Sequence, residues 1–172
     1  MAARTIRPEA PGDAAAIRAV TAAAFAGMAH SDGTEPAIVD GLRAAGALTV
    51  SLVAVADGTI IGHAAFSSVT IDQAGDHGGR GWLGLGPVSV APGWQRRGTG
   101  SALVRAGLAL CQESSAGGCV VLGEPAFYGR FGFRADPRLR LEGVPPAYFQ
   151  MLAFGGDVPS GMVRFHPAFG VK

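Results

Sequence analysis

The sequence predicts a single mixed α+β domain with one central, mostly antiparallel sheet. The chain has 172 residues, which falls within the ~100–200 residues that one domain ordinarily contains. Its hydrophobic periods follow the order strand, two helices, three strands, helix, strand, short helix and further strands, a pattern typical of helices packed on a sheet. No linker, repeat or low-complexity tract interrupts this order, so residues 1–172 are expected to form one domain.

The first 45 residues are expected to form a strand and two helices. Residues 5–8 have the composition of a short strand, which Pro8 would end. A first helix follows, with Asp13 as its candidate N-cap, and a second helix covers residues 34–45 before a glycine stop. The residues expected to face inward are Ile17, Val20, Ala24 and Phe25 of the first helix and Ile38, Val39 and Leu42 of the second.

The middle of the chain changes to a strand-like period. Residues 48–55 and 60–71 are β-rich, and the Asp57-Gly58 pair between them is a hairpin signal. A third strand is expected over residues 82–90, and Pro87 inside it predicts a bulge or an edge. The remaining elements are expected to be a helix over 98–113, a buried strand over 119–122, a short helix from Pro125, and strands at 131–133, 149–154 and 162–165.

Composition and charge exclude several classes of protein. Hydrophobic residues make up 48% of the chain and charged residues 16%, which excludes a disordered, solvating chain. The net charge of +1 argues against a nucleic-acid or anionic-membrane partner. No segment has the pattern of a signal peptide or of a membrane span, so we expect a cytoplasmic protein. Cys111 and Cys119 are expected to be reduced core residues, and the histidines show no metal-like spacing.

The segment from Gln95 to Ser101 carries the clearest chemical signal. It joins a strand to a helix, and a helix N-terminus offers unpaired N–H groups to an anion. Gly98 and Gly100 would let a phosphate approach these groups, and adjacent arginines add positive charge. This predicts a ligand with a pyrophosphate. The spacing fits neither a Walker loop nor a dinucleotide fingerprint, but at this point a domain binding ATP or NAD and a purely structural loop both stay open.

Two motifs in this order resemble those of the GCN5-related N-acetyltransferase (GNAT) family. Residues 95–100, Gln-Arg-Arg-Gly-Thr-Gly, are similar to its Gln/Arg-x-x-Gly-x-Gly/Ala motif. Residues 128–133, Tyr-Gly-Arg-Phe-Gly-Phe, are similar to its Tyr-x-x-x-Gly-Phe signature. The fuller segments 125–133 and 161–169 resemble a bacterial subgroup of predicted acetyltransferases, the YhbS-like group. The resemblance covers essentially the whole chain.

The resemblance implies an acyltransferase that moves acetyl from acetyl-CoA to an amine by direct attack on the thioester. A splayed strand pair would hold the pantetheine, the helix start would hold the pyrophosphate, and Tyr128 would act as general acid on the departing thiolate. The implied acceptor is a small-molecule amine or a lysine side chain, with no metal. The implied acetyl-CoA-binding residues are Val88, Ser89, Val90, Gln95, Arg96, Arg97, Gly98, Thr99, Gly100 and Ser101.

The acceptor amine must be neutral to attack, and this requires a route for its proton. An amine with a pKa of ~10.4 is neutral in only about one molecule in a thousand at pH 7.4. The candidate bases are Glu35, His63 and Glu124. Their structural alternatives are helix-start electrostatics, a buried sheet histidine and an N-cap residue, respectively. Phe25 and Glu35 are candidates for the acceptor site, with core packing as the alternative for Phe25.

Three questions stay open at the level of sequence. The chain could instead be a non-catalytic acyl-CoA-binding or sensor module, or it could transfer a longer acyl group. Acceptor specificity would depend on the loops around residues 26–35, 72–80 and 135–160, none of which carries a charge run. The aromatic C-terminal segment could support a homodimer.

Overall fold

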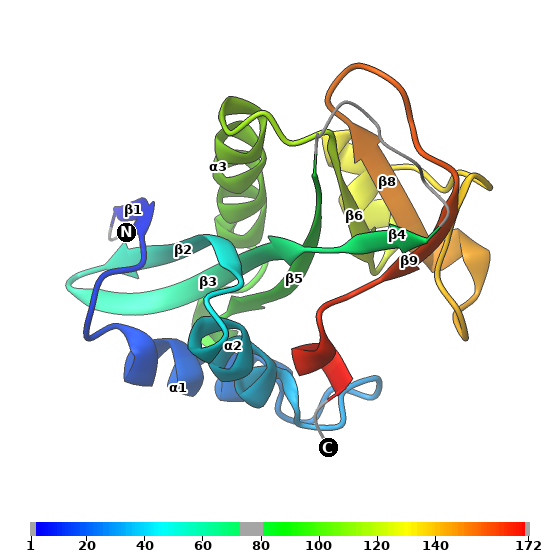
Figure 1. Ribbon diagram of the computed structural model, residues 1–172. Coiled ribbons are helices and arrows are strands. Elements are labelled where there is room, and N and C mark those ends of the chain that lie inside the picture. Colours follow the sequence, from blue (N-terminus) through cyan, green and yellow to red (C-terminus); the bar gives the residue numbers. More distant parts are fainter. Residues whose placement is uncertain (1–2, 73–80, 171–172) are drawn as a thin grey trace.

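The computed structural model describes residues 3–72 and 81–170 (Figure 1). Within these residues, the main sheet has six strands, antiparallel except for the parallel pair β5–β6, and a smaller sheet has the order β4-β9-β7. The strands of the main sheet, in spatial order, are β1 (Arg4–Pro8), β2 (Leu48–Ala56), β3 (Thr59–Ser68), β5 (Trp82–Val90), β6 (Gly118–Leu122) and β8 (Phe149–Ala153). Those of the smaller sheet are β4 (Thr70–Asp72), β9 (Gly161–Arg164) and β7 (Leu139–Arg140).

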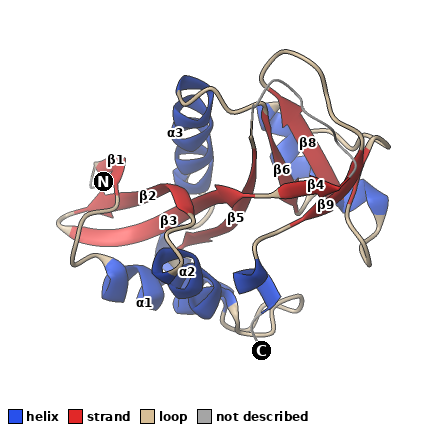
Figure 2. Cartoon of the chain, in the orientation of Figure 1, coloured by secondary structure: helices blue, strands red, loops and turns tan. Residues whose placement is uncertain are grey.

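Helices cover both faces of the main sheet (Figure 2). Helix α3 (Thr99–Glu113) lies on one face, and α1 (Ala14–Phe25) and α2 (Glu35–Ala44) lie on the other. Helix α4 (Pro125–Tyr128) follows β6. Short 3₁₀ turns occur at η1 (Pro92–Trp94), η2 (Gly129–Phe131), η3 (Pro146–Tyr148) and η4 (Pro167–Gly170). The predicted mixed α+β architecture is confirmed.

The two faces of the sheet bury separate apolar clusters. On the α3 side, Leu103 and Val104 have no exposed surface and pack with Phe66 of β3. On the other side, Ile17 of α1 and Val39 of α2 pack against the middle of β2. The predicted inward residues are buried except Phe25, which is half-buried at the end of α1.

Strand β5 is bulged, as Pro87 predicts. The β3–β5 register shifts between Ala64 and Phe66, where β5 has one residue more than β3. Beyond this bulge, β5 no longer pairs with β6, because the parallel ladder joins only residues 82–85 to residues 118–121. Among the described residues, the edge of β5 that faces away from β3 therefore has no strand partner after Leu85, so its polar backbone groups need other partners.

Three expectations are corrected in detail. Residues 131–133 do not form a strand, because Gly132 adopts a left-handed φ of 96° after the η2 turn; the next residue, Arg134, alone bridges to β8. The expected strand over 60–71 is divided between two sheets at position 69. Asp13 occupies the N-cap position of α1 without capping it, since its carboxylate accepts hydrogen bonds from Arg7 and from the Ala10 N–H instead. Most of the predicted loop over 72–80 lies outside the described residues.

Both cysteines are free and buried, as expected. The C-terminal aromatic segment packs within its own chain, with Phe149 and Phe165 in contact in one cluster and η4 packed on α2. Of its aromatic side chains, Tyr148 is exposed. The homodimer stays a prediction.

Candidate active site

The end of β5 is attached to the loop that follows it. Val88, Ser89 and Val90 lie beyond the bulge, and of the described strands only β3 pairs with them. The side-chain amide of Gln95 donates a hydrogen bond of 3.0 Å to the Val90 carbonyl. The loop therefore starts from a fixed position relative to the unpaired strand edge.

The loop then turns sharply into α3. Arg96 and Gly98 have left-handed φ values of 63° and 82°, and glycine adopts this conformation without strain. The first helical hydrogen bond runs from the Ala102 N–H to the Gly98 carbonyl at 3.0 Å. The N–H groups of residues 99–101 precede that bond, so they form the positive, unpaired end of the helix. The geometry is suited to an anion, as the sequence predicts.

Sequence reasoning missed Arg4 at this loop. From β1, its guanidinium donates to the carbonyls of Arg97 at 3.0 Å and Gly98 at 3.3 Å. These bonds orient two carbonyl oxygens toward Arg4, and they bring a further positive charge to the start of α3. No local signal identified Arg4, since 93 positions separate it from Arg97.

Tyr128 lies at the end of α4, in a cluster of aromatic rings. Its ring makes edge contacts with Phe127 and Phe133 at centroid distances of 4.9 and 5.9 Å. A Cβ added to Gly123 would lie 2.4 Å from the Tyr128 ring, and one added to Gly100 would lie 3.7 Å from Phe127. Helix α4 therefore faces the start of α3, and glycine is required beneath Tyr128.

The Tyr128 hydroxyl is suited to donate a proton. Burial, with a smaller contribution from the neighbouring Cys119 thiol, raises the pKa of Tyr128 to about 12. The hydroxyl therefore stays protonated at neutral pH. No described group accepts or donates a hydrogen bond at this hydroxyl, so its proton is available to a ligand.

An open pocket of about 510 Å³ lies at the loop between α1 and α2. The Ser89 hydroxyl of β5 contacts the Thr21 hydroxyl of α1 at 3.3 Å, one helical turn before Phe25. Thr21 directly precedes the lining residue Ala22, so the pocket lies along the same helix that contacts β5. Glu35 lies beside it, because both of its carboxylate oxygens contact the hydroxyl of the lining residue Ser31. The lining residues are Ala22, Phe25, Ala26, Gly27, Met28, Ser31, Asp32, Gly33 and Pro36.

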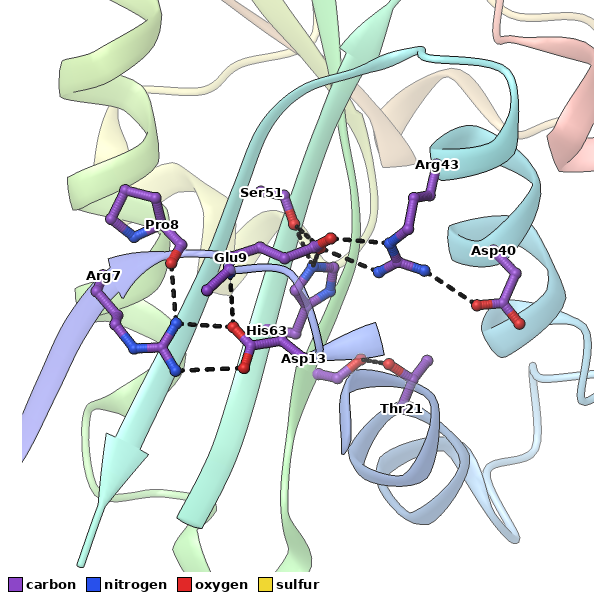
Figure 3. Close-up of polar contacts among 11 residues, drawn as sticks. Arg7, Pro8, Glu9, Asp13, Thr21, Asp40, Arg43, Ser51 and His63 are labelled. Atoms are coloured by element: carbon purple, nitrogen blue, oxygen red, sulfur yellow. Dashed lines mark hydrogen bonds and ion pairs between the residues drawn. The ribbon is translucent and has the colours of Figure 1, made fainter. Parts of the chain in front are cut away.

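His63 lies in a buried polar network on the same face of the sheet (Figure 3). Its Nε2 is 2.8 Å from the Ser51 hydroxyl, which donates a 2.6 Å hydrogen bond to Glu9. Because the Ser51 hydroxyl donates its proton to Glu9, it accepts a hydrogen bond from Nε2 of His63, and Nδ1 of His63 carries the lone pair. Arg43 of α2 donates to both oxygens of Glu9, at 2.8 and 3.0 Å. Sequence patterns did not indicate Glu9, Ser51 or Arg43.

This environment keeps His63 neutral. Burial foremost, assisted by the Arg43 charge and opposed by Glu9, lowers the pKa of His63 to about 4. The side chain has no exposed surface, and Nδ1 has no partner among the described residues. His63 therefore lies beneath the helices and away from the pocket surface.

Glu124, the third candidate base, is exposed. It occupies the N-cap position of α4, where its backbone carbonyl accepts the N–H groups of Phe127 and Tyr128 at 3.1 Å each. Its side chain makes no capping hydrogen bond. The three candidate bases thus lie in three different places: beside the pocket, beneath the helices and in solvent.

Among residues 3–72 and 81–170, no group of three or more His, Cys, Asp or Glu side chains could hold a metal ion. No helix in the described part of the chain is both long and apolar enough to cross a membrane.

Known proteins are similar to this chain in sequence and in fold. A family model described as "Acetyltransferase (GNAT) domain" matches residues 48–135. The uncharacterised N-acetyltransferase YhbS of Escherichia coli (strain K12) is 37% identical over 172 residues, covering 95% of this chain and 97% of YhbS.

Two solved structures superpose over nearly the whole chain. A GNAT acetyltransferase from Brucella melitensis, in complex with acetyl-CoA, is 50% identical with a TM-score of 0.84, covering 98% of this chain and 99% of that one. The E. coli YhbS structure, in complex with CoA, is 32% identical with a TM-score of 0.88, covering 99% and 94%. By sequence and fold together, this chain belongs to the GNAT family of acetyltransferases.

Proposed function

We propose that this protein transfers the acetyl group of acetyl-CoA to the amine of a small molecule with an apolar body. Its acetyltransferase class and its acyl-CoA cosubstrate follow from membership of the GNAT family and from relatives that bind acetyl-CoA and CoA. One observation carries the assignment to this site. Strand β5 separates from β6 after Leu85. Val90 at its end and Phe127, the neighbour of Tyr128, both approach Gly100 at the α3 N-terminus.

The cosubstrate would bind along the unpaired edge of β5. Pantetheine amides need hydrogen-bond partners, and the backbone of Val88 to Val90 has a free edge there. The pyrophosphate would accept hydrogen bonds from the N–H groups of Thr99, Gly100 and Ser101, with Gly98 permitting close approach. Gln95 holds the loop in place, and Arg96 and Arg97 supply positive charge.

Transfer would proceed by direct attack. The amine nitrogen bonds to the thioester carbonyl carbon, and a backbone N–H near Val88 stabilises the resulting oxyanion. The carbon–sulfur bond then breaks, and Tyr128 donates its proton to the departing thiolate. Burial raises the pKa of Tyr128 to about 12, so the hydroxyl keeps its proton until negative charge develops on the departing sulfur, to which it then donates.

The pocket between α1 and α2 is the proposed acceptor site. A volume of about 510 Å³ suits a small ligand, and the walls from Ala22, Phe25, Met28 and Pro36 suit an apolar body. Glu35 is the one candidate base beside this pocket, so it is assigned to hold the ammonium and to receive its proton. His63 is buried, and Glu124 is exposed at α4.

The test measures both binding and turnover. Release of CoA thiol would be followed with arylalkylamines, amino acids and lysine peptides as acceptors, and the affinity for acetyl-CoA would be measured by calorimetry. Tyr128→Phe should lower kcat by about 10²–10⁴-fold with little change in acetyl-CoA affinity. Tyr148→Phe is the matched control, since Tyr148 is the other of two tyrosines and is exposed. Glu35→Gln should reduce kcat most at low pH, where the neutral amine is rarest.

Each alternative predicts a distinct outcome. Tight acetyl-CoA binding with no turnover for any amine would support a non-catalytic acyl-CoA-binding module. Faster turnover with a longer acyl-CoA would show that acetyl is not the preferred group. Absence of acetyl-CoA binding would refute the proposed function.

A further inference from the structure

A network of polar side chains runs beneath the two helices that line the proposed acceptor pocket (Figure 3). It crosses three strands of the main sheet before it reaches α2 and then α1. None of its side chains takes part in the proposed transfer. Each member contacts the next by a hydrogen bond or an ion pair, in the order His63, Ser51, Glu9, Arg43, Asp40 and Arg18.

The Glu9–Arg43 pair is the centre of this polar network. Arg43 donates to both carboxylate oxygens of Glu9, at 2.8 and 3.0 Å, and the Ser51 hydroxyl donates to the same carboxylate at 2.6 Å. The backbone N–H of Glu9 also donates to the Ser51 carbonyl at 2.9 Å, so the carboxylate starts from a fixed point on the sheet. Hydrogen bonds from Arg43 foremost, opposed by burial, hold the pKa of Glu9 below its ordinary value. The pair is therefore ionised, and its bidentate geometry fixes direction as well as distance.

Apolar contacts hold α2 on the fold in a less specific way. Val39 packs in one buried cluster with Val53 of β2. Leu42 packs in another with Ala168 of η4. Burial of apolar surface is non-directional, so these contacts keep α2 against its neighbours without fixing its rotation or its shift along its own axis. The contact of Arg43 with Glu9 supplies that missing restraint.

Helix α2 carries this restraint to the acceptor pocket. Arg43 lies in its last turn, while Glu35 and Pro36 lie in its first turn, beside the pocket. With a rise of 1.5 Å per residue, Arg43 and Glu35 are about 12 Å apart along the axis. A displacement of the helix at Arg43 would therefore displace Glu35 as well.

The other end of the polar network lies beside β5. His63 is directly opposite Ser89 in the β3–β5 ladder, and directly opposite residues of antiparallel strands have Cβ atoms ~4.5–5.5 Å apart on one face. Through Nε2, the buried His63 donates to Ser51, and this directs the Ser51 proton toward Glu9. The position of Glu9 is thus set relative to the part of β5 that would hold pantetheine.

We propose that Glu9 and Arg43 are positioning residues for the acceptor amine, an inference that rests on the proposed function. The pair would fix α2 so that Glu35 meets the amine at the distance from the thioester that transfer requires. This role accounts for ionic groups at a place where apolar side chains could also hold a helix. Replacing a buried ion pair by apolar residues is often neutral for stability, so we assign the pair to geometry instead.

The test is a double-mutant cycle of Glu9→Gln and Glu35→Gln. Steady-state kcat and KM would be measured with the best amine from the acceptor screen, and acetyl-CoA affinity would be measured by calorimetry. Glu9→Gln should lower kcat/KM for the amine by about 10- to 100-fold, since a misplacement of ~1 Å can cost ~10²-fold, and acetyl-CoA affinity should not change. In the Glu35→Gln background the same substitution should have little further effect, because both changes act on one group.

Two further variants separate positioning from stability. Arg43→Lys keeps the charge but cannot donate as a bidentate fork, so it should lower kcat/KM for the amine as Glu9→Gln does. Asp13→Asn is the matched control, because Asp13 accepts from two nitrogens of Arg7, at 2.7 and 3.4 Å, in a second pair that joins β1 to a helix. This pair lies outside the polar network, so Asp13→Asn should keep the wild-type kcat/KM even where its melting temperature falls.

The outcomes distinguish this inference from the proposed function. Wild-type kcat/KM in Glu9→Gln, or an equal loss in the wild-type and Glu35→Gln backgrounds, would overturn the inference and leave the proposed function intact. An equal loss of kcat/KM in Asp13→Asn would show that turnover follows stability alone, and would also overturn the inference. Wild-type turnover in Glu35→Gln itself would refute the role of Glu35 in the proposed function, and the inference with it.

Discussion

Substitution of Gly123 by alanine should displace the proposed general acid without altering its chemistry. The added Cβ would lie 2.4 Å from Cε2 of Tyr128, whereas carbon atoms normally approach to ~3.5–4.0 Å. The Gly123 backbone is held on both sides, since its N–H donates to the Tyr148 carbonyl at 2.9 Å and its carbonyl accepts from Gln150 at 3.1 Å. The ring, not the backbone, must therefore move, by about 1 Å, and a misplacement of that size can cost ~10²-fold in rate.

Steady-state kcat and acetyl-CoA affinity would be measured for Gly123→Ala, Tyr128→Phe and the double variant. We expect Gly123→Ala to lower kcat by about 10²-fold, and we expect the double variant to resemble Tyr128→Phe alone, because a displaced hydroxyl and an absent one share the same defect. Gly129→Ala is the control, since its added Cβ meets nothing within 4 Å. Wild-type kcat in Gly123→Ala, or additive losses in the double variant, would refute this account of Tyr128.

Further predictions concern stability and thiol chemistry. In the folded protein the pKa of His63, about 4, lies below its ordinary value of 6.5. The contribution of neutral His63 to the free energy of unfolding is therefore full above pH 6.5 and falls by about 3 kcal/mol in total as the pH approaches 4. In urea unfolding between pH 7 and 4, the wild type should lose stability more steeply than His63→Gln. Gly107→Ala should destabilise the fold by about 1–3 kcal/mol, since the new Cβ would lie 2.2 Å from the buried Phe66 ring; an unchanged melting temperature would contradict this packing. Burial raises the pKa of Cys111 to about 12 and raises that of Cys119, so neither thiol should react with iodoacetamide at pH 7 until the protein is unfolded; labelling of the folded protein would show that a thiol is accessible.

Local periodicity was sufficient to predict most helices and strands. The apolar stripe of α3 and the β2–β3 hairpin follow from spacing within one segment. Pro87 indicated the bulge because proline disturbs a strand wherever it stands. The strand predicted at residues 131–133 was wrong because local spacing was misleading there. The aromatic residues alternate as in a strand, but Gly132 adopts a left-handed conformation and the rings pack around Tyr128.

The parts of the site that could not be predicted depend on contacts distant in sequence. Ser51 and His63 meet because of the register between β2 and β3, and Glu9 joins them from the end of β1. Arg4 reaches the start of α3 from the far edge of the sheet. Each residue has an ordinary local context, so only the tertiary arrangement distinguishes it.

Strand β5 relates the two proposed ligand sites to each other. Alternate side chains of a strand point to opposite faces. Val90 accordingly approaches Gly100 at the start of α3, while Ser89 contacts Thr21 of α1. Residues Val88 to Val90 would thus pair with pantetheine through their backbone. Their side chains would support the pyrophosphate loop on one face of the sheet and contact α1, the helix that lines the acceptor pocket, on the other. The bulge sets the direction of residues 88–90. A movement of β5 would therefore shift both the thioester and the acceptor amine, and so change the distance between them.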